Sequence, residues 1–200
     1  MIDITALRSI QEQQGRSPRV LDVACGTGLL LKQLLAQISD IEVYGLDASA
    51  DMLSQARAAL QDQHHVHLEC LQIRKGMSTN LPYAQGNFDL ITCTNALHDI
   101  PEAVALLTGL AKLLTPGGQL VIEDFSPRRP RLFWAAFEWF IQQIEGNSVH
   151  AYTVNEAFSL CKHAGLYVAR EKEFIIDWLW HGWVLSVYGT TQITISSQTD

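Results

Sequence analysis

Apolar residues occur along this chain in two patterns, short continuous runs and longer stretches with apolar side chains three or four positions apart. The short runs predict buried strands, and the longer stretches predict amphipathic helices. Strands are expected at 20–24, 41–46, 66–73, 88–94, 119–124, 166–176 and 178–190, and helices at 27–38, 49–60, 101–114, 131–145 and 155–163. Strands that alternate with helices in this way are typical of an α/β domain with a parallel sheet.

The turn after the first predicted strand carries the clearest chemical signal. Asp22 lies near the end of that strand, and the turn itself contains Gly26 and Gly28. Glycine allows a tight turn and lets a ligand approach without meeting a Cβ atom, while the following helix directs free N–H groups at the same place. The second predicted strand ends at Asp47, ~20 residues further on, where a carboxylate can accept hydrogen bonds from both hydroxyls of a ribose. The turn is therefore predicted to bind a nucleotide.

The residues around the turn bear on which nucleotide binds. The G-x-G-x-x-G pattern of NAD(P)-binding proteins would place its last glycine at position 31, which is Leu31 here. Asp22 lies just before the turn, where it suits a ligand with a cationic end better than one with two phosphates. An NAD(P)-dependent oxidoreductase is nevertheless kept as an alternative.

Six motifs follow one another at natural spacings: Asp22–Gly28, Asp47, Leu81–Tyr83, Gly86–Ile91, Ala96–His98 and Leu114–Gly118. Together they resemble the motifs of class I S-adenosylmethionine-dependent methyltransferases, over roughly residues 19–125. Within that class the chain is most similar to small-molecule enzymes of the quinone and menaquinone C-methylase group. The resemblance implies a Rossmann-like, doubly wound sheet of seven strands, mostly parallel with an antiparallel last strand. It also implies S-adenosyl-L-methionine as cofactor and a small apolar or aromatic methyl acceptor; a catalytically silent S-adenosylmethionine-binding module is the other alternative.

The resemblance also implies which residues contact the cofactor. They are Asp22, Ala24, Cys25, Gly26, Gly28, Asp47, Ala48, Met52, Met77, Ser78 and Asn95. Met77 stands where the family usually has an aspartate that accepts a hydrogen bond from the adenine amino group. We therefore expect cofactor binding to persist but to be weaker.

The acceptor is expected beyond the carboxyl ends of the later strands, because ligands of open α/β sheets bind at that edge. His98 follows the fourth strand and is the candidate proton acceptor; the alternative is a structural residue that caps the loop before the next helix. Asp124, Phe137, Phe140 and Tyr152 are candidate acceptor contacts.

The predicted helix 131–145 is apolar nearly all round and so needs covering on more than one side. Packing under the neighbouring segment 150–165 is the simplest explanation. An apolar acceptor, a second copy in a homodimer and a membrane surface are the alternatives.

Length and composition limit the remaining interpretations. Two hundred residues suit one domain, and we expect 1–18 to be an N-terminal helix and linker, 19–200 a single methyltransferase domain, and 125–165 an acceptor-side helical insertion. The net charge of -7 argues against a nucleic-acid partner, and no apolar run reaches the ~18 residues of a membrane span. Four cysteines without paired spacing indicate reduced thiols and a cytoplasmic location.

The sequence His64-His65-Val66-His67 raises the question of a metal site. We expect none, because no nearby group of Cys, Asp or Glu completes a set of ligands.

Overall fold

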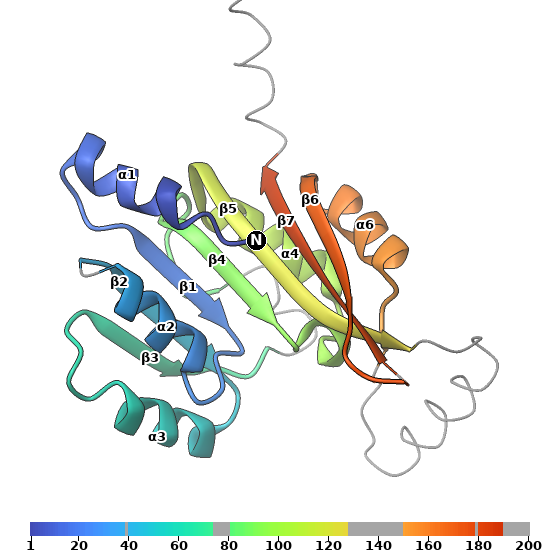
Figure 1. Ribbon diagram of the computed structural model, residues 1–200, viewed down its shortest axis with the longest axis horizontal. Coiled ribbons are helices and arrows are strands. Elements are labelled where there is room, and N and C mark those ends of the chain that lie inside the picture. The colour runs from blue at the N-terminus through green and yellow to red at the C-terminus, as the bar shows by residue number, and fades with distance from the viewer. Residues whose placement is uncertain (39, 74–80, 128–149, 179, 190–200) are drawn as a thin grey trace, which may run out of the picture.

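The structure is a computed structural model, and it describes residues 1–38, 40–73, 81–127, 150–178 and 180–189. Its elements are α1 (Ile4–Gln14), β1 (Arg19–Val23), α2 (Leu29–Gln37), β2 (Glu42–Asp47), α3 (Ala50–Ala59), β3 (Val66–Cys70), β4 (Phe88–Thr94), the 3-10 turn η1 (Leu97–Asp99), α4 (Ala103–Leu113), β5 (Leu114–Pro127), α6 (Val154–His163), β6 (Leu166–Ile175) and β7 (Trp180–Gly189). Over these residues the strands form one seven-stranded sheet in the order β3-β2-β1-β4-β5-β7-β6 (Figure 1).

The direction of the strands confirms the predicted fold class. Strands β1 to β5 pair in parallel, and β7 is antiparallel to both β5 and β6. The chain winds outward from β1 to β3 and then crosses to β4 on the other side of β1. The carboxyl ends of β1 and β4 therefore flank the point where the winding reverses, which is where doubly wound sheets bind ligands.

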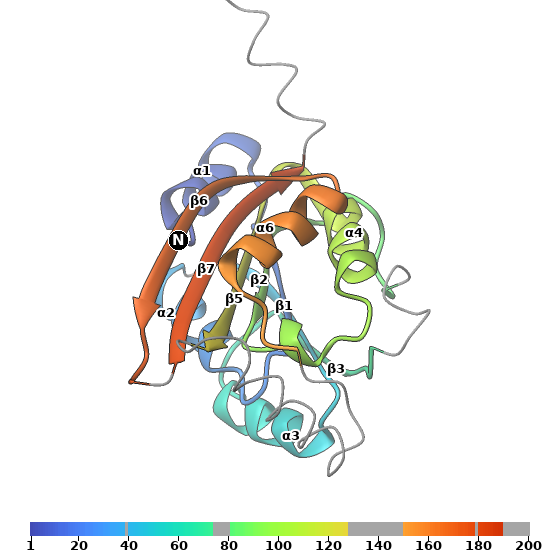
Figure 2. The same ribbon diagram turned by 90° about the vertical axis from the view of Figure 1, so that its right-hand side faces the viewer.

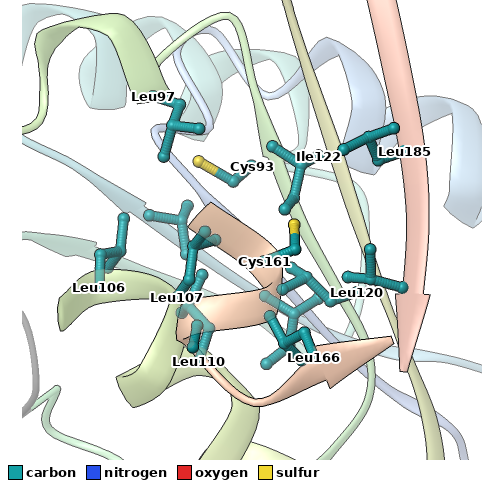
Figure 3. Packing of buried hydrophobic residues seen from close by; sticks show 14 of the residues in the cluster. Cys93, Leu97, Leu106, Leu107, Leu110, Leu120, Ile122, Cys161, Leu166 and Leu185 are labelled. Atoms are coloured by element: carbon teal, nitrogen blue, oxygen red, sulfur yellow. The ribbon is translucent and has the colours of Figure 1, made fainter. Parts of the chain in front are cut away.

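Helices cover both faces of the sheet (Figure 2). Helices α1, α2 and α3 contribute Leu7, Leu31 and Leu53 to the apolar cluster on one face, whereas α4 and α6 pack on the other. Figure 3 shows the second cluster, in which Leu106, Leu107 and Leu110 of α4 face Cys161 of α6 and side chains of the sheet. Leu97 of η1 is fully buried in that cluster, so the core fixes the turn that carries His98.

Local sequence signals account for two helix starts. The predicted N-cap Ser49 accepts a hydrogen bond from the backbone of Met52, and the predicted capping box of Thr153 and Glu156 is present at the start of α6. No helix among the described residues is long and apolar enough to cross a membrane.

Two predicted strand boundaries are wrong. Strand β3 ends at Cys70, whereas it was expected to continue to residue 73. Strand β5 begins at Leu114, whereas residues 114–118 were expected to form only the end of a helix. The pairing of β5 with β4 shifts register between Phe88 and Leu90. Gly117, which precedes Gly118 in this part of β5, has a φ of 85°, so glycine allows the irregular backbone within the strand. The predicted helix 131–145 lies outside the described residues.

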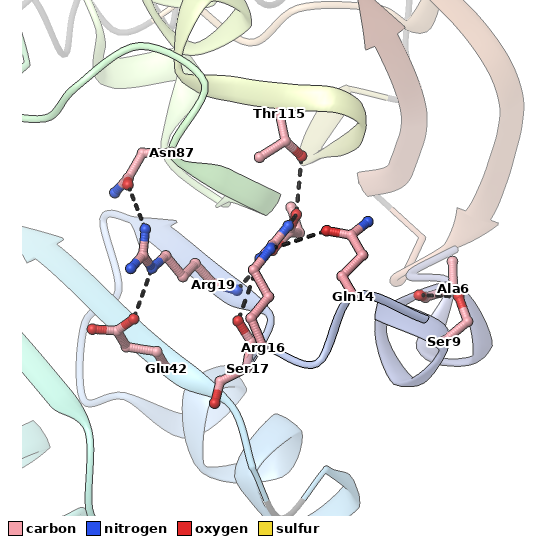
Figure 4. Close-up of polar contacts among 10 residues, drawn as sticks. Ala6, Ser9, Gln14, Arg16, Ser17, Arg19, Glu42, Asn87 and Thr115 are labelled. Carbon is pink, nitrogen blue, oxygen red and sulfur yellow. Dashed lines mark hydrogen bonds and ion pairs between the residues drawn. The ribbon is translucent and has the colours of Figure 1, made fainter. Parts of the chain in front are cut away.

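A partly buried ion pair fastens the segment before β1 to the amino end of β4. The Arg16 guanidinium donates two hydrogen bonds of 2.7 Å to the Asp89 carboxylate, which also accepts from Thr115 Oγ1 and the Arg19 backbone. Figure 4 shows Arg16 turned toward Thr115, with Arg19 between Asn87 and Glu42. Burial alone would raise the pKa of Asp89, but these hydrogen bonds and the charge of Arg16 outweigh it and lower that pKa.

We predict that Arg16→Met lowers the free energy of unfolding by about 2 kcal/mol at neutral pH. Losing one partner of a fully buried pair costs ~3–5 kcal/mol. The destabilisation is smaller here because the Arg16 side chain is 38% exposed and water can solvate the site. The pair stabilises the protein only while Asp89 is ionised, so the cost should shrink as the pH falls through its lowered pKa. Urea unfolding at about pH 7 and pH 3 measures this. Arg8→Met is the control, since Arg8 is an exposed arginine of α1 that bonds a backbone carbonyl.

Candidate functional site

The glycine turn between β1 and α2 adopts a backbone conformation that few residues tolerate. Ala24, Gly26 and Gly28 have φ values of 61°, 54° and 74°. A Cβ added at Gly26 would meet nothing within 4 Å, so this glycine leaves open space for a ligand. A Cβ added at Gly28 would lie 3.1 Å from Leu60 Cδ1, so the second glycine also permits close packing of the turn against α3. That packing role was not predicted from the sequence.

Cys25 directs its thiol into the core. A Cβ added at Gly45 would lie 2.8 Å from Cys25 Sγ, so the thiol occupies space that only a glycine in β2 leaves free. Burial raises the pKa of Cys25 to about 12, which makes the thiol unreactive. Cys25 therefore contributes to the site through its backbone, whose N–H donates to the Leu46 carbonyl. The role of Gly45 in making room for this thiol was not predicted from the sequence. A glycine in the interior of a strand is the signal that could have indicated it.

Asp47 joins the turn to the end of β2. Its Oδ2 accepts a hydrogen bond of 2.7 Å from the Gly26 N–H, and its Oδ1 accepts one of 2.8 Å from the Ser49 N–H. Each carboxylate oxygen retains a further lone pair, so Asp47 can still accept from a ligand hydroxyl. Ala48 and Met52, two further candidates, are exposed beside it.

Asp22 is buried behind the turn. Only 1% of the residue is exposed, and its Oδ1 accepts a hydrogen bond of 2.6 Å from Thr92 Oγ1. Desolvation raises its pKa to about 7; the charge of Asp47 adds to that increase, and the Thr92 hydrogen bond opposes it. A cation bound at the turn would favour ionised Asp22. The predicted role of Asp22 toward a cationic ligand is therefore an electrostatic one exerted from below the surface.

His98 and Asp124 form a pair at the carboxyl ends of β4 and β5. The His98 Nδ1 lies 2.9 Å from Asp124 Oδ1, and the His98 backbone N–H donates to Asp124 Oδ2. The ring of Phe125 lies against the imidazole, with the two centroids 4.5 Å apart. Both His98 and Asp124 were candidates from the sequence, but their pairing and the contact with Phe125 were not foreseen.

Several charges act on the His98 imidazole. Burial disfavours the imidazolium, but the hydrogen bond to Asp124 and the charges of Asp124 and Asp99 outweigh it, and they raise the pKa of His98 above its ordinary value. The His98 Nε2 lies 3.4 Å from the exposed Asp99 carboxylate. A ring whose Nδ1 proton is held by one carboxylate and whose Nε2 lies beside a second, exposed carboxylate is arranged to accept a proton at Nε2.

The segment before α6 closes over this pair. The His150 backbone N–H donates to the His98 carbonyl, and the ring of His150 packs against that of Tyr152 at 4.6 Å. The Tyr152 carbonyl accepts a hydrogen bond of 2.7 Å from Nε1 of the buried Trp183. Tyr152, a candidate acceptor contact, is thus held by Trp183 and His150, two residues after the backbone bond to His98.

The structure therefore gathers most of the candidates at one edge of the sheet. Asn95 also lies there, exposed, with a φ of 53° that asparagine tolerates better than most residues. Met77, Ser78, Phe137 and Phe140 lie outside the described residues. His67, considered for a metal site, instead stacks on Tyr44 and lies 3.4 Å from Glu42.

The strand order, the reversed strand β7, and the glycine turn bonded to the carboxylate that ends β2 define a Rossmann-like α/β protein. A family model described as a methyltransferase domain matches residues 21–120, which is half of the chain. The chain belongs to this methyltransferase family, and the predicted resemblance to class I methyltransferases of the menaquinone C-methylase group is confirmed.

Individual proteins agree with this assignment. A demethylmenaquinone methyltransferase of Deinococcus radiodurans is 34% identical over 135 residues, which are 66% of this chain and 54% of the relative. An uncharacterised methyltransferase of Synechocystis is 30% identical over 155 residues, 76% of this chain and 68% of the relative. The crystal structure of an S-adenosylmethionine-dependent methyltransferase from Mesorhizobium loti has a TM-score of 0.62 at 20% identity and covers 91% of this chain and 96% of its own. The chain spans about half the length of the demethylmenaquinone methyltransferases that it matches.

We predict that Asp22→Asn changes stability in a pH-dependent way. The pKa of Asp22 is about 7 in the folded protein and lower when unfolded, so folding takes up a proton between about pH 4 and pH 7 and wild-type stability falls over that range. The asparagine side chain does not ionise, so the variant does not lose stability over that pH range. The variant should match the wild type near pH 4 and exceed it by on the order of 3 kcal/mol near pH 8.

Urea unfolding at both pH values measures this effect. Asp62→Asn, a change of the same charge at an exposed site, is the control and should show no pH-dependent difference. An Asp22→Asn effect that is equal at the two pH values would show that folding does not raise the pKa of Asp22.

Proposed function

We propose that this chain transfers a methyl group from S-adenosyl-L-methionine to a small apolar or aromatic acceptor. The observation that carries the proposal is the negative charge at the open glycine turn, where Asp22 and Asp47 act on each other and favour a cationic ligand. Membership of the methyltransferase family supports it. The names of the demethylmenaquinone methyltransferases point to a quinone-like acceptor for those relatives, and an acceptor of that kind is proposed here.

The residues at the turn fit this cofactor. Gly26 leaves open space at the turn, and Asp47 is held by two backbone N–H groups with lone pairs free for ribose hydroxyls. Gly28, the N-cap of α2, makes no side-chain cap, so the first N–H groups of that helix are free for a polar ligand group. Asp22 adds negative charge toward a positive amino acid end.

The rest of the site has to bind and orient the methyl acceptor. When bound, S-adenosyl-L-methionine would supply a methyl group already activated by its positive sulfur. The protein then has to orient the acceptor and exclude water, for which positioning alone can contribute ~7–11 kcal/mol. Phe125 and Tyr152 provide apolar surface beside His98 for that purpose.

His98 is the proposed general base, which takes the proton when the methyl acceptor has to lose one. Asp124 takes the hydrogen bond from Nδ1, which fixes the ring and leaves Nε2 to receive the proton. Asp124 also stabilises the imidazolium that results, because the carboxylate is already in contact with the ring.

We predict that Asp47→Ala weakens binding of S-adenosyl-L-methionine by about 100-fold or more. Two hydrogen bonds to a charged acceptor are lost, each contributing ~1.5 kcal/mol or more. Isothermal titration calorimetry measures the affinity. Asp62→Ala is the control, because it removes the same charge from an exposed position beyond the other end of α3.

Two results of this titration, and one of an activity assay, would contradict the proposal. Unchanged affinity in the Asp47→Ala protein would show that the ligand lies elsewhere. Tighter binding of NADH than of S-adenosyl-L-methionine by the wild type would favour the oxidoreductase alternative. Tight cofactor binding with no transfer to a broad panel of quinones and phenols would favour the silent binding module.

We predict that His98→Asn slows methyl transfer to a phenolic or hydroquinone acceptor by about 100-fold or more, because general base catalysis contributes ~10²–10⁴-fold. Cofactor affinity should stay within about twofold. In the wild type, activity should rise with pH through a pKa above 6.5, since Asp124 and Asp99 raise the pKa of His98.

The pH profile separates a base from a structural residue. Asp124→Asn should move the rise in activity to lower pH, and Asp99→Asn should move it in the same direction by less, because Asp99 is exposed. A rise at the same pH in all three proteins would show that His98 does not take the proton.

A further inference from the structure

The tip of the β6–β7 hairpin, residues 175–178, is apolar and exposed. Ile175, Ile176 and Trp178 are 67%, 51% and 68% exposed, and they are three of the six large hydrophobic residues that are exposed in the described part of the chain. A turn between two strands is usually polar, with glycine, asparagine, aspartate or proline. This tip therefore places apolar surface where stability does not require it.

The conformation of the tip is set by its polar atoms. Asp177 Oδ1 accepts a hydrogen bond of 2.9 Å from the Trp180 backbone N–H, and the backbone N–H groups of Ile176 and Asp177 donate to the Trp180 carbonyl. These bonds close the hairpin, and the side chains of Ile175, Ile176 and Trp178 remain more than half exposed on it.

The tip lies at the acceptor side of the site. Pro127 at the carboxyl end of β5 pairs with Trp180 at the start of β7, and Figure 1 shows the tip beside that end of β5. The Phe125 ring contacts the His98 ring at 4.5 Å and the Trp180 ring at 4.9 Å. A continuous row of rings therefore leads from the proposed proton acceptor to the base of the tip.

We propose that the β6–β7 tip inserts into the surface of a lipid bilayer, and that the row from Trp180 to His98 admits an apolar acceptor dissolved in that bilayer. The choice of a bilayer rests on the apolar acceptor of the proposed function. Tryptophan and isoleucine at a protruding tip suit the boundary between headgroups and acyl chains.

The size of the tip argues for a bilayer over a second copy of the chain. A stable protein interface buries about 800 Å² on each partner. Three partly exposed side chains offer on the order of 400 Å². A bilayer needs no matching surface, so a small apolar tip is enough for reversible attachment.

The charges near the tip indicate how attachment occurs. Asp177 lies in the tip, and the chain carries a net charge of -7. The one charged residue of the tip is acidic, so the proposal assigns attachment to apolar insertion. Binding should therefore occur on neutral phosphatidylcholine vesicles and persist at high salt.

Sedimentation of the full chain with phosphatidylcholine vesicles tests this proposal. Ile175→Ser/Trp178→Ser should lower the partition coefficient by about tenfold or more. Tyr167→Ser is the matched control, because Tyr167 is a 51% exposed apolar residue near the other end of β6, and it should bind like the wild type. Trp178→Ser alone should give an intermediate loss, and unchanged cofactor affinity by calorimetry will show that each variant is folded.

The following outcomes support or overturn insertion of the tip into a bilayer. Wild-type protein that stays in the supernatant overturns the proposal, as does equal vesicle binding by the tip variant and the wild type. Loss of self-association in the tip variant, measured by sedimentation velocity without vesicles, overturns it in favour of a second copy. Vesicle binding that depends on the tip, in a protein that methylates no acceptor, supports the docking surface and contradicts the proposed function instead.

Discussion

The hydrogen bond from the Gly26 N–H to the Asp47 carboxylate is the contact on which the site depends. It ties the turn after β1 to the end of β2, and it exists because parallel neighbours place their carboxyl ends at the same edge. The same geometry brings Asp47 close enough to raise the pKa of the buried Asp22. These two carboxylates disfavour each other's ionisation, and the positive ligand of the proposed function would relieve that repulsion.

The acceptor side depends on the other half of the sheet. Leu97 is locked in the core between α4 and the strands, and this fixes the short turn in which the His98 backbone reaches Asp124. The reversed strand β7 lies next to β5, and its Trp183 holds the Tyr152 carbonyl against the same region. The proposed cofactor edge is therefore built by the first half of the chain and the proposed acceptor edge by the second, and they meet at the carboxyl ends of the paired strands β1 and β4.

Local patterns in the sequence were enough to predict the parts of this structure that are local. The glycine turn, the aspartate that ends β2, and the caps at Ser49 and Thr153 each depend on residues within a few positions of one another. Contacts between distant residues left no such signal. His98 and Asp124 are 26 positions apart, so their pairing follows only from the register of β4 and β5. The packing role of Gly28 depends on where α3 lies, and the irregular start of β5 depends on its pairing with β4.

Two buried aspartates show how the same side chain acquires different roles. Asp22 and Asp124 are 1% and 3% exposed, so each has lost nearly all of its water. Asp22 is paired with the neutral hydroxyl of Thr92, which cannot carry a compensating charge, and its pKa rises to about 7. Asp124 is paired with an imidazole that can become positive, together with two backbone N–H groups. A buried carboxylate that has no cation beside it favours a cationic ligand nearby, whereas a carboxylate beside a histidine makes that histidine a stronger base. The different partners of the two aspartates, rather than their burial, therefore underlie the two roles proposed for them, Asp22 toward a positive cofactor and Asp124 toward the proton on His98.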